Sequence, residues 1–102
     1  MSDGRYLSNT RINRLALTVS VNTTLTVDSS EFLWVNTGSG NITVTLPSAS
    51  SAISKRFIIK KITSDVNVVQ FSGTVEGVTP GNLTTQYQQI RIYSDGTNWY
   101  NV

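Results

Sequence analysis

Apolar and polar residues alternate at period two from Leu15 onward, in short runs separated by Gly, Asn, Ser and Asp. In LALTVSV (15–21), for example, the leucines and valines occupy every second position, so they share one face of an extended strand. Apolar residues do not recur at helical spacing, and SASSAIS (48–54) is long enough only for a loop or one helical turn. The pattern predicts an all-β chain.

The strands expected from this pattern are short: 15–21, 24–27, 31–37, 41–46, 56–62, 66–71, 86–94 and 97–102. About eight strands at close spacing favour a single small β-sandwich or a jelly-roll-like barrel over residues 15–102. The link Gly38-Ser39-Gly40 is interpreted as a hairpin connection, and Asp95-Gly96 as a type I′ turn between the last two strands.

Residues 1–14 lack this alternation and are expected to form an extended N-terminal arm. They carry the whole net charge of +2, whereas the remaining Lys and Arg balance the remaining Asp and Glu. Such a cationic arm could bind an acidic partner surface or a neighbouring subunit, or it could be a frayed terminus. The residues that would make the contact are three arginines and two apolar anchors: Arg5, Tyr6, Leu7, Arg11 and Arg14.

The chain contains neither Cys nor His, which excludes disulfides, thiolate or imidazole metal sites and Ser-His or Cys-His nucleophiles. Asp28 and Glu31 could in principle serve as a carboxylate pair, but VDSSEF has the composition of a turn in which Asp28 accepts backbone N–H bonds. We therefore expect no catalytic site, cofactor or metal. No secretory signal and no apolar run of about 20 residues is present, so synthesis in the cytoplasm without membrane insertion is expected.

The strand RFIIKKI (56–62) is apolar on both faces, because Phe57 and Ile59 share one face while Ile58 and Ile62 share the other. One face is expected to meet the core and the other a second subunit. The last strand is interpreted in the same way, with Trp99 and Tyr100 on opposite sides, one of them in the core. The predicted subunit interface consists of Ile58, Lys60, Ile62 and Tyr100.

The basic and aromatic residues suggest two other kinds of ligand, nucleic acid and a glycan. The cluster Lys55, Arg56, Lys60 and Lys61 lies near Phe57, but the aromatic residues form no evident stacking platform and the body of the chain is neutral, so nucleic acid is not expected to bind. The aromatic residues could instead form a platform for a glycan, although core or interface packing is the favoured role: Trp34, Tyr87, Tyr93, Trp99 and Tyr100.

The ordered segments NITVTLPSA, RFIIKKI, SDVNVVQFSG, VEGV and YSDGTNWYNV resemble the small β domain of tailed-phage virion proteins, especially tail fibres. The resemblance covers roughly residues 41–102. Such domains usually end long fibre chains, whereas only 40 residues precede the matched part here, too few for a fibre shaft.

The resemblance implies a non-enzymatic phage structural protein, made in the host cytoplasm and located in the virion. Its length favours a capsid decoration (cement) or head-fibre subunit that reinforces the head, with the arm on the major capsid protein or another virion protein. Relatives of this kind are commonly homotrimers. The alternative is a tail-fibre or adhesin module that binds a host-surface glycan or receptor.

Overall fold

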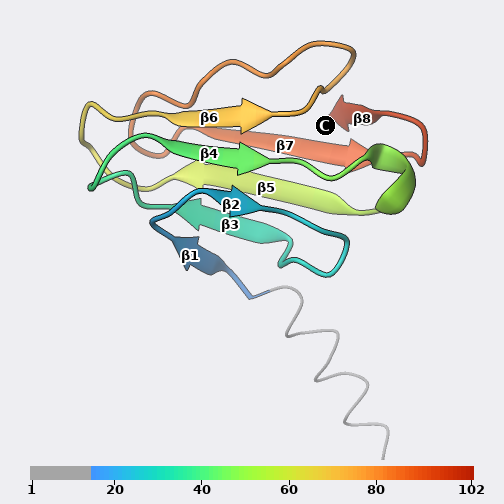
Figure 1. Ribbon diagram of the computed structural model, residues 1–102, viewed down its shortest axis with the longest axis horizontal. Coiled ribbons are helices and arrows are strands. Elements are labelled where there is room, and N and C mark those ends of the chain that lie inside the picture. Colours follow the sequence, from blue (N-terminus) through green and yellow to red (C-terminus); the bar gives the residue numbers. More distant parts are fainter. Residues whose placement is uncertain (1–14) are drawn as a thin grey trace, which may run out of the picture.

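The computed structural model describes residues 15–102, which form two packed β-sheets and no α-helix, as the alternation predicts (Figure 1). One 3₁₀ turn, η1, covers Ala49–Ser51. The strands are β1 (Leu17–Val19), β2 (Thr23–Thr24), β3 (Phe32–Val35), β4 (Ile42–Thr45), β5 (Arg56–Lys61), β6 (Val69–Ser72), β7 (Gln89–Ser94) and β8 (Trp99–Asn101).

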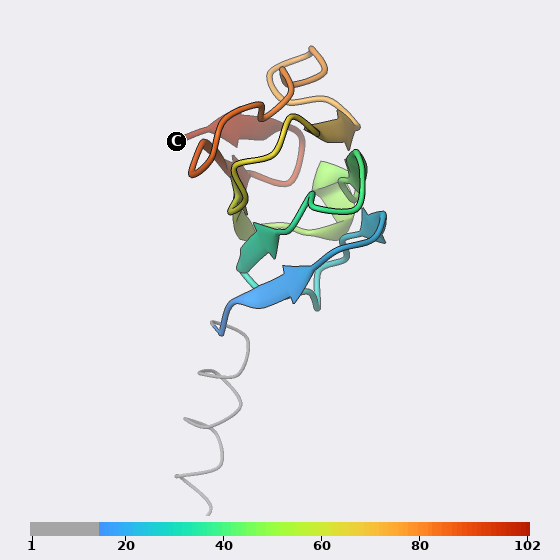
Figure 2. The same ribbon diagram turned by 90° about the vertical axis from the view of Figure 1, so that its left-hand side faces the viewer.

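Successive strands lie in opposite sheets until the last pair. A five-stranded sheet has the order β1-β3-β5-β7-β8, and a three-stranded sheet has the order β2-β4-β6. Strands β1, β3 and β5 are parallel, as are β2, β4 and β6, so the chain winds three times around one core (Figure 2). Corresponding residues therefore stack, with Leu17 beside Leu33 and Leu33 beside Ile59. The antiparallel strands β7 and β8 complete the larger sheet.

The predicted hairpin at Gly38-Ser39-Gly40 is wrong, because β3 and β4 belong to different sheets. Alternation identifies the face that a strand buries but not the strand with which it pairs. The link instead crosses between the layers, and Thr37, the residue directly before it, is fully buried.

The predicted final hairpin is confirmed, but its turn is not type I′, because only Gly96 has a positive φ. The Asp95 carboxylate accepts the N–H groups of Thr97 and Asn98, both at 2.9 Å, and this local bonding closes a longer loop. Backbone angles typical of type I′ occur instead at Glu76-Gly77, with φ of 53° and 84°.

The inward residues of both sheets form one apolar core, closed at the hairpin end by aromatic packing. Phe57 is fully buried, and its ring centroid lies 5.6 Å from that of Trp99. The indole N–H of Trp99 donates to the carbonyl of Pro47 at 2.8 Å. Trp99 is 4% exposed and Tyr100 39%, so the two side chains do lie on opposite sides of β8 as predicted.

A polar cluster, which we call the polar corner, lies where β5 leaves the larger sheet: Thr37, Lys61, Thr63, Asp65 and Asn67. Lys61 is fully buried, and its ammonium group donates to the carbonyls of Thr63 and Asp65. It also lies 3.6 Å from the Asp65 carboxylate. Thr37 donates to the same carboxylate at 2.6 Å. The side chain of Lys61 therefore points inward, and its ammonium group finds its hydrogen-bond acceptors inside the fold.

These contacts lower the pKa of Asp65 to about 2, chiefly through the hydrogen bond from Thr37, with help from Thr63, Lys61 and Asn67 against partial desolvation. Because the folded-state pKa lies below the unfolded value of about 4, the stabilisation is present above that value and disappears as pH falls from about 4 to 2. We predict that the melting temperature falls across this range. Asp65→Asn should be less stable at neutral pH and should show a shallower acid slope in pH-dependent melting. An unchanged slope would contradict this role.

Candidate functional site

The surface of the five-stranded sheet that points away from the smaller sheet is the main candidate site, and we call it the outward face. In β3, β5 and β7 buried residues alternate with exposed or half-exposed ones. Strand register places Phe32 beside Ile58, Trp34 beside Lys60, and Tyr93 beside Tyr100. The outward face consists of Phe32, Trp34, Arg56, Ile58, Lys60, Ile62, Arg91, Tyr93 and Tyr100.

Aromatic side chains on this face are packed against their neighbours yet remain accessible. The ring centroids of Phe32 and Trp34 are 5.8 Å apart, and the Lys60 ammonium group lies 5.5 Å from the Trp34 ring centroid. Tyr93 and Tyr100 are directly opposite each other and are 37% and 39% exposed. The sheet backbone holds these rings at fixed spacing, so they can be covered with little loss of conformational entropy.

The outward face is cationic although residues 15–102 carry five basic and five acidic residues. Arg56 pairs with Glu31, donating Nε–H at 2.8 Å and also Nη2–H. Lys60 and Arg91 have no carboxylate within 4.0 Å among the residues that the structure describes. The acidic groups Asp65, Glu76 and Asp95 accept hydrogen bonds elsewhere in the fold. The charges of a neutral domain are thus unevenly distributed.

The structure brings the four predicted interface residues, Ile58, Lys60, Ile62 and Tyr100, together on the outward face. The predicted partner-binding arm, Arg5, Tyr6, Leu7, Arg11 and Arg14, lies outside the described residues.

Sequence reasoning did not assign the other five members to this face: Phe32, Trp34, Arg56, Arg91 and Tyr93. EFLWVNT (31–37) was interpreted as a nearly continuous apolar strand, which obscured the alternation of Phe32 and Trp34 with the buried Leu33 and Val35. QIRIYS has clear alternation, and that signal could have placed Arg91 and Tyr93 on one face.

The basic cluster of the sequence is divided by the fold. Lys61 points inward to the polar corner, whereas Arg56 and Lys60 belong to the outward face. The ammonium group of Lys55 donates to the carbonyl of Ser29 at 2.5 Å, and burial lowers its pKa against the opposing effect of Glu31. The predicted aromatic platform is likewise divided, since Trp99 lies in the core and Trp34, Tyr93 and Tyr100 on the outward face.

Asp28 and Glu31, which the sequence disfavours as a catalytic carboxylate pair, have other contacts in the structure. Glu31 binds Arg56. The turn around Asp28 is held by hydroxyl groups, since Thr26 accepts the Asp28 N–H at 3.3 Å and Ser29 accepts the Thr26 N–H at 2.8 Å. The turn is thus held by the hydroxyl groups of Thr26 and Ser29 and not, as predicted, by the Asp28 carboxylate.

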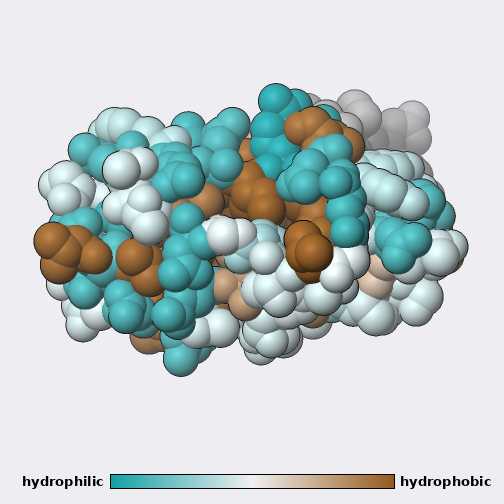
Figure 3. Space-filling model, turned by 90° about the horizontal axis from the view of Figure 1, so that it is seen from above, coloured by the Kyte–Doolittle hydropathy of each residue, from teal (hydrophilic) through white to brown (hydrophobic). Residues whose placement is uncertain are grey.

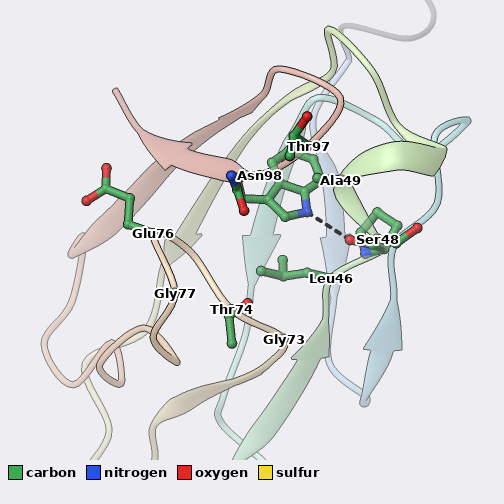
Figure 4. Close-up of a pocket in the computed structure, with 11 residues that line it drawn as sticks. Leu46, Ser48, Ala49, Gly73, Thr74, Glu76, Gly77, Thr97 and Asn98 are labelled. Carbon is green, nitrogen blue, oxygen red and sulfur yellow. Dashed lines mark hydrogen bonds between the residues drawn. The ribbon is translucent and has the colours of Figure 1, made fainter.

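A pocket of about 240 Å³ opens between the η1 loop, residues 73–77 and residues 97–99 (Figure 4). Leu46 and Trp99 provide apolar lining, and Ser48, Thr74, Thr97 and Asn98 provide neutral polar groups. The carboxylate of Glu76 points away from the pocket and accepts the Asn101 N–H at 3.0 Å. The pocket therefore presents mainly neutral hydroxyl and amide groups beside its apolar lining.

Within residues 15–102, no group of three acidic side chains is placed to hold a metal ion. The same part of the chain has no helix long and apolar enough to cross a membrane. Comparisons with protein-family models, curated proteins and solved structures found no match.

Proposed function

We propose that the chain is a non-enzymatic structural subunit of a phage virion, of the capsid-decoration class, that packs its outward face against an acidic surface of the head. The observation that carries this proposal is the outward face itself, a sheet surface with accessible aromatic rings and two cations that have no carboxylate partner within residues 15–102, a region of zero net charge. The resemblance to small β domains of tailed-phage virion proteins indicates the kind of particle.

The composition of the outward face suits a protein interface. Aromatic residues and arginine are enriched where protein surfaces bury each other, and partly exposed rings such as Trp34, Tyr93 and Tyr100 provide large contact areas. Lys60 and Arg91 would favour approach to carboxylates and reject cationic surfaces. The homotrimer and the arm contact that the resemblance implies belong to the same proposal, with three copies around a three-fold position of the capsid. In this arrangement Ile58, Lys60, Ile62 and Tyr100, first expected at a subunit interface, face the head instead.

A second candidate function is a tail-fibre or adhesin module that binds a host-surface glycan. The pocket of Figure 4 favours it, because neutral hydroxyl and amide groups beside apolar lining suit an uncharged, hydroxyl-rich ligand. Its small volume limits the ligand to about one sugar unit. Trp99 is almost fully buried, so a sugar could not stack on its face.

The proposal predicts saturable binding of the full-length protein to phage heads from which it has been stripped. The double variant Lys60→Gln/Arg91→Gln should bind at least tenfold more weakly, because it removes two positive charges from the contact. Gln70→Glu/Ser72→Glu changes net charge equally but lies on exposed positions of β6, in the other sheet, and should bind much as the unaltered protein does. Sedimentation of protein with heads would measure occupancy. Equal weakening of both variants would indicate only a general charge effect, and no binding by the unaltered protein would contradict the proposal.

A further inference from the structure

The two opposite ends of the packed sheets differ in whether other parts of the chain cover their edge strands. At the end formed by β6 and β8, residues 73–83 cover the strand edges: Leu83 exchanges two 3.0 Å hydrogen bonds with Val69, and Glu76 donates its N–H to the Trp99 carbonyl at 2.9 Å. Figure 3 views this end and shows mainly hydrophilic and neutral side chains with smaller hydrophobic patches. The end formed by β1 and β2, lowest in Figure 1, has no such covering segment among residues 15–102.

The uncovered end is apolar. Leu17 occupies the inward position next to the fully buried Leu33, yet it is 46% exposed, because no strand of residues 15–102 lies on its other side. Leu15, Val21 and Val27 are also exposed. Proteins usually protect such edges with charged residues, Pro or bulges, and LALTVSV contains no charge and no Pro. The exposed apolar side chains and the unprotected strand edge therefore make this end suitable for contact with another protein segment.

The backbone of β1 is ready to accept another strand. The Val19 carbonyl accepts the N–H of Asn36 in the step that leads on from β3. In a strand, the N–H and C=O groups of adjacent residues point to opposite sides, so those of Thr18 point away from β3 to the open edge. No strand within residues 15–102 pairs with that edge.

The chain's own residues 1–14 are poorly suited to this place by sequence. At the spacing of the first winding, where Leu17 lies beside Leu33, a preceding strand would set Met1 beside Leu17 and Asp3 beside Val19. An aspartate would then occupy an inward position of the core, where an unpaired carboxylate is strongly unfavourable.

We propose that β1 pairs antiparallel with β1 of a second copy about a two-fold axis at Thr18. The edge is self-complementary, because Thr18 of each copy can exchange both backbone hydrogen bonds with its counterpart. Leu17 then lies opposite the second copy's Val19, and both side chains remain on the inward side, so the two cores join. The axis is perpendicular to the sheet, so both outward faces point the same way and form one continuous surface. The contact leaves that surface free and could join neighbouring trimers on a capsid.

Thr18→Cys in the full-length protein tests this pairing. The chain has no native Cys, so a disulfide can form only between copies. Hydrogen-bonded antiparallel partners have Cα atoms about 5.5 Å apart, within the range that a disulfide spans. Mild oxidation should convert most of the variant to a dimer on a non-reducing denaturing gel. The control Gln70→Cys, on the exposed side of β6, should stay largely monomeric.

Native mass measurement gives a second readout. Leu17→Lys places a charge in the paired core and should leave no species larger than a monomer, or than a trimer where one also forms, while the partly exposed site leaves the fold intact. Equal cross-linking of Thr18→Cys and Gln70→Cys, or an unchanged mass for Leu17→Lys, would overturn the proposal. So would cross-linking of Thr18→Cys only after removal of residues 1–14, which would assign the edge to that segment. None of these readouts depends on binding to heads.

Discussion

Replacement of Trp99 by Ala is expected to lower the free energy of unfolding by about 3–5 kcal/mol, the usual cost of deleting a large buried aromatic side chain. Trp99 is 4% exposed, packs on Phe57 with centroids 5.6 Å apart and donates a hydrogen bond to Pro47. Through this hydrogen bond and its packing on Phe57, the indole holds the final hairpin against the segment that follows β4. Its loss removes apolar contacts and leaves the Pro47 carbonyl without this donor.

Tyr100→Ala is the matched control, because it removes a neighbouring aromatic ring from the same strand on the opposite side. Tyr100 is 39% exposed, and its loss should cost less than about 1 kcal/mol. Denaturant unfolding followed by fluorescence or circular dichroism would measure both values. If Trp99→Ala fails to fold, Trp99→Phe, which keeps a ring but loses the N–H, should show an intermediate loss. Equal destabilisation by Trp99→Ala and Tyr100→Ala would contradict the arrangement of β8.

Lys61→Met should lower the free energy of unfolding by about 1–3 kcal/mol, the usual cost of leaving buried hydrogen-bonding groups without their partner. The substitution keeps a long unbranched side chain in a fully buried position. It removes the ammonium group that donates to the carbonyls of Thr63 and Asp65 and that lies 3.6 Å from the Asp65 carboxylate. The buried polar atoms would lose their donor without gaining an equivalent one.

Lys60→Met provides the control one residue earlier on the same strand. Lys60 lies on the outward face over Trp34, and this exposed cation–π contact contributes about 0.5–1 kcal/mol at most. Chemical denaturation of both variants at neutral pH would compare them. A Lys61→Met protein as stable as Lys60→Met would show that the polar corner does not depend on its buried charge.

These two neighbouring lysines illustrate how much the sequence could reveal. Alternation in RFIIKKI placed Lys60 and Lys61 on opposite faces, and the structure bears this out. It could not indicate that the Lys61 ammonium group would find carbonyls from Thr63 and Asp65, because those contacts depend on the path of the chain after β5. Alternation of apolar and polar residues shows which side chains share a face of a strand. Whether a charged side chain can be buried depends on hydrogen bonds to residues outside that strand.

Alternation could not predict which strands pair, because pairing also depends on the path of the chain between strands. The sequence predicted two layers and a final hairpin, but Gly38-Ser39-Gly40 was interpreted as a hairpin connection between β3 and β4. A Gly-rich link of this length can join neighbouring strands of one sheet or cross between two layers. The buried Thr37 hydroxyl, bonded to Thr63 and Asp65, favours the crossing, and those partners are more than 20 residues away in the chain.

The candidate site was predicted in part. Ile58, Lys60, Ile62 and Tyr100 share the outward face as expected, while Phe32, Trp34, Arg91 and Tyr93 join them through strand neighbours that only the sheet order provides. The cationic character of that face also emerged only from the fold, which leaves Lys60 and Arg91 without a carboxylate partner within residues 15–102 and places Asp65, Glu76 and Asp95 elsewhere. Net charge alone could not distinguish an even from an uneven distribution.

Electron microscopy of virions labelled with an antibody against this protein tests the proposed function most directly. A capsid-decoration subunit should give label at many regularly spaced positions over the head surface, and virions lacking the protein should show none. Label confined to tail tips or fibres would contradict the decoration role and favour the adhesin alternative. Absence of label from the whole particle, with the protein present in infected cells, would contradict a virion function altogether.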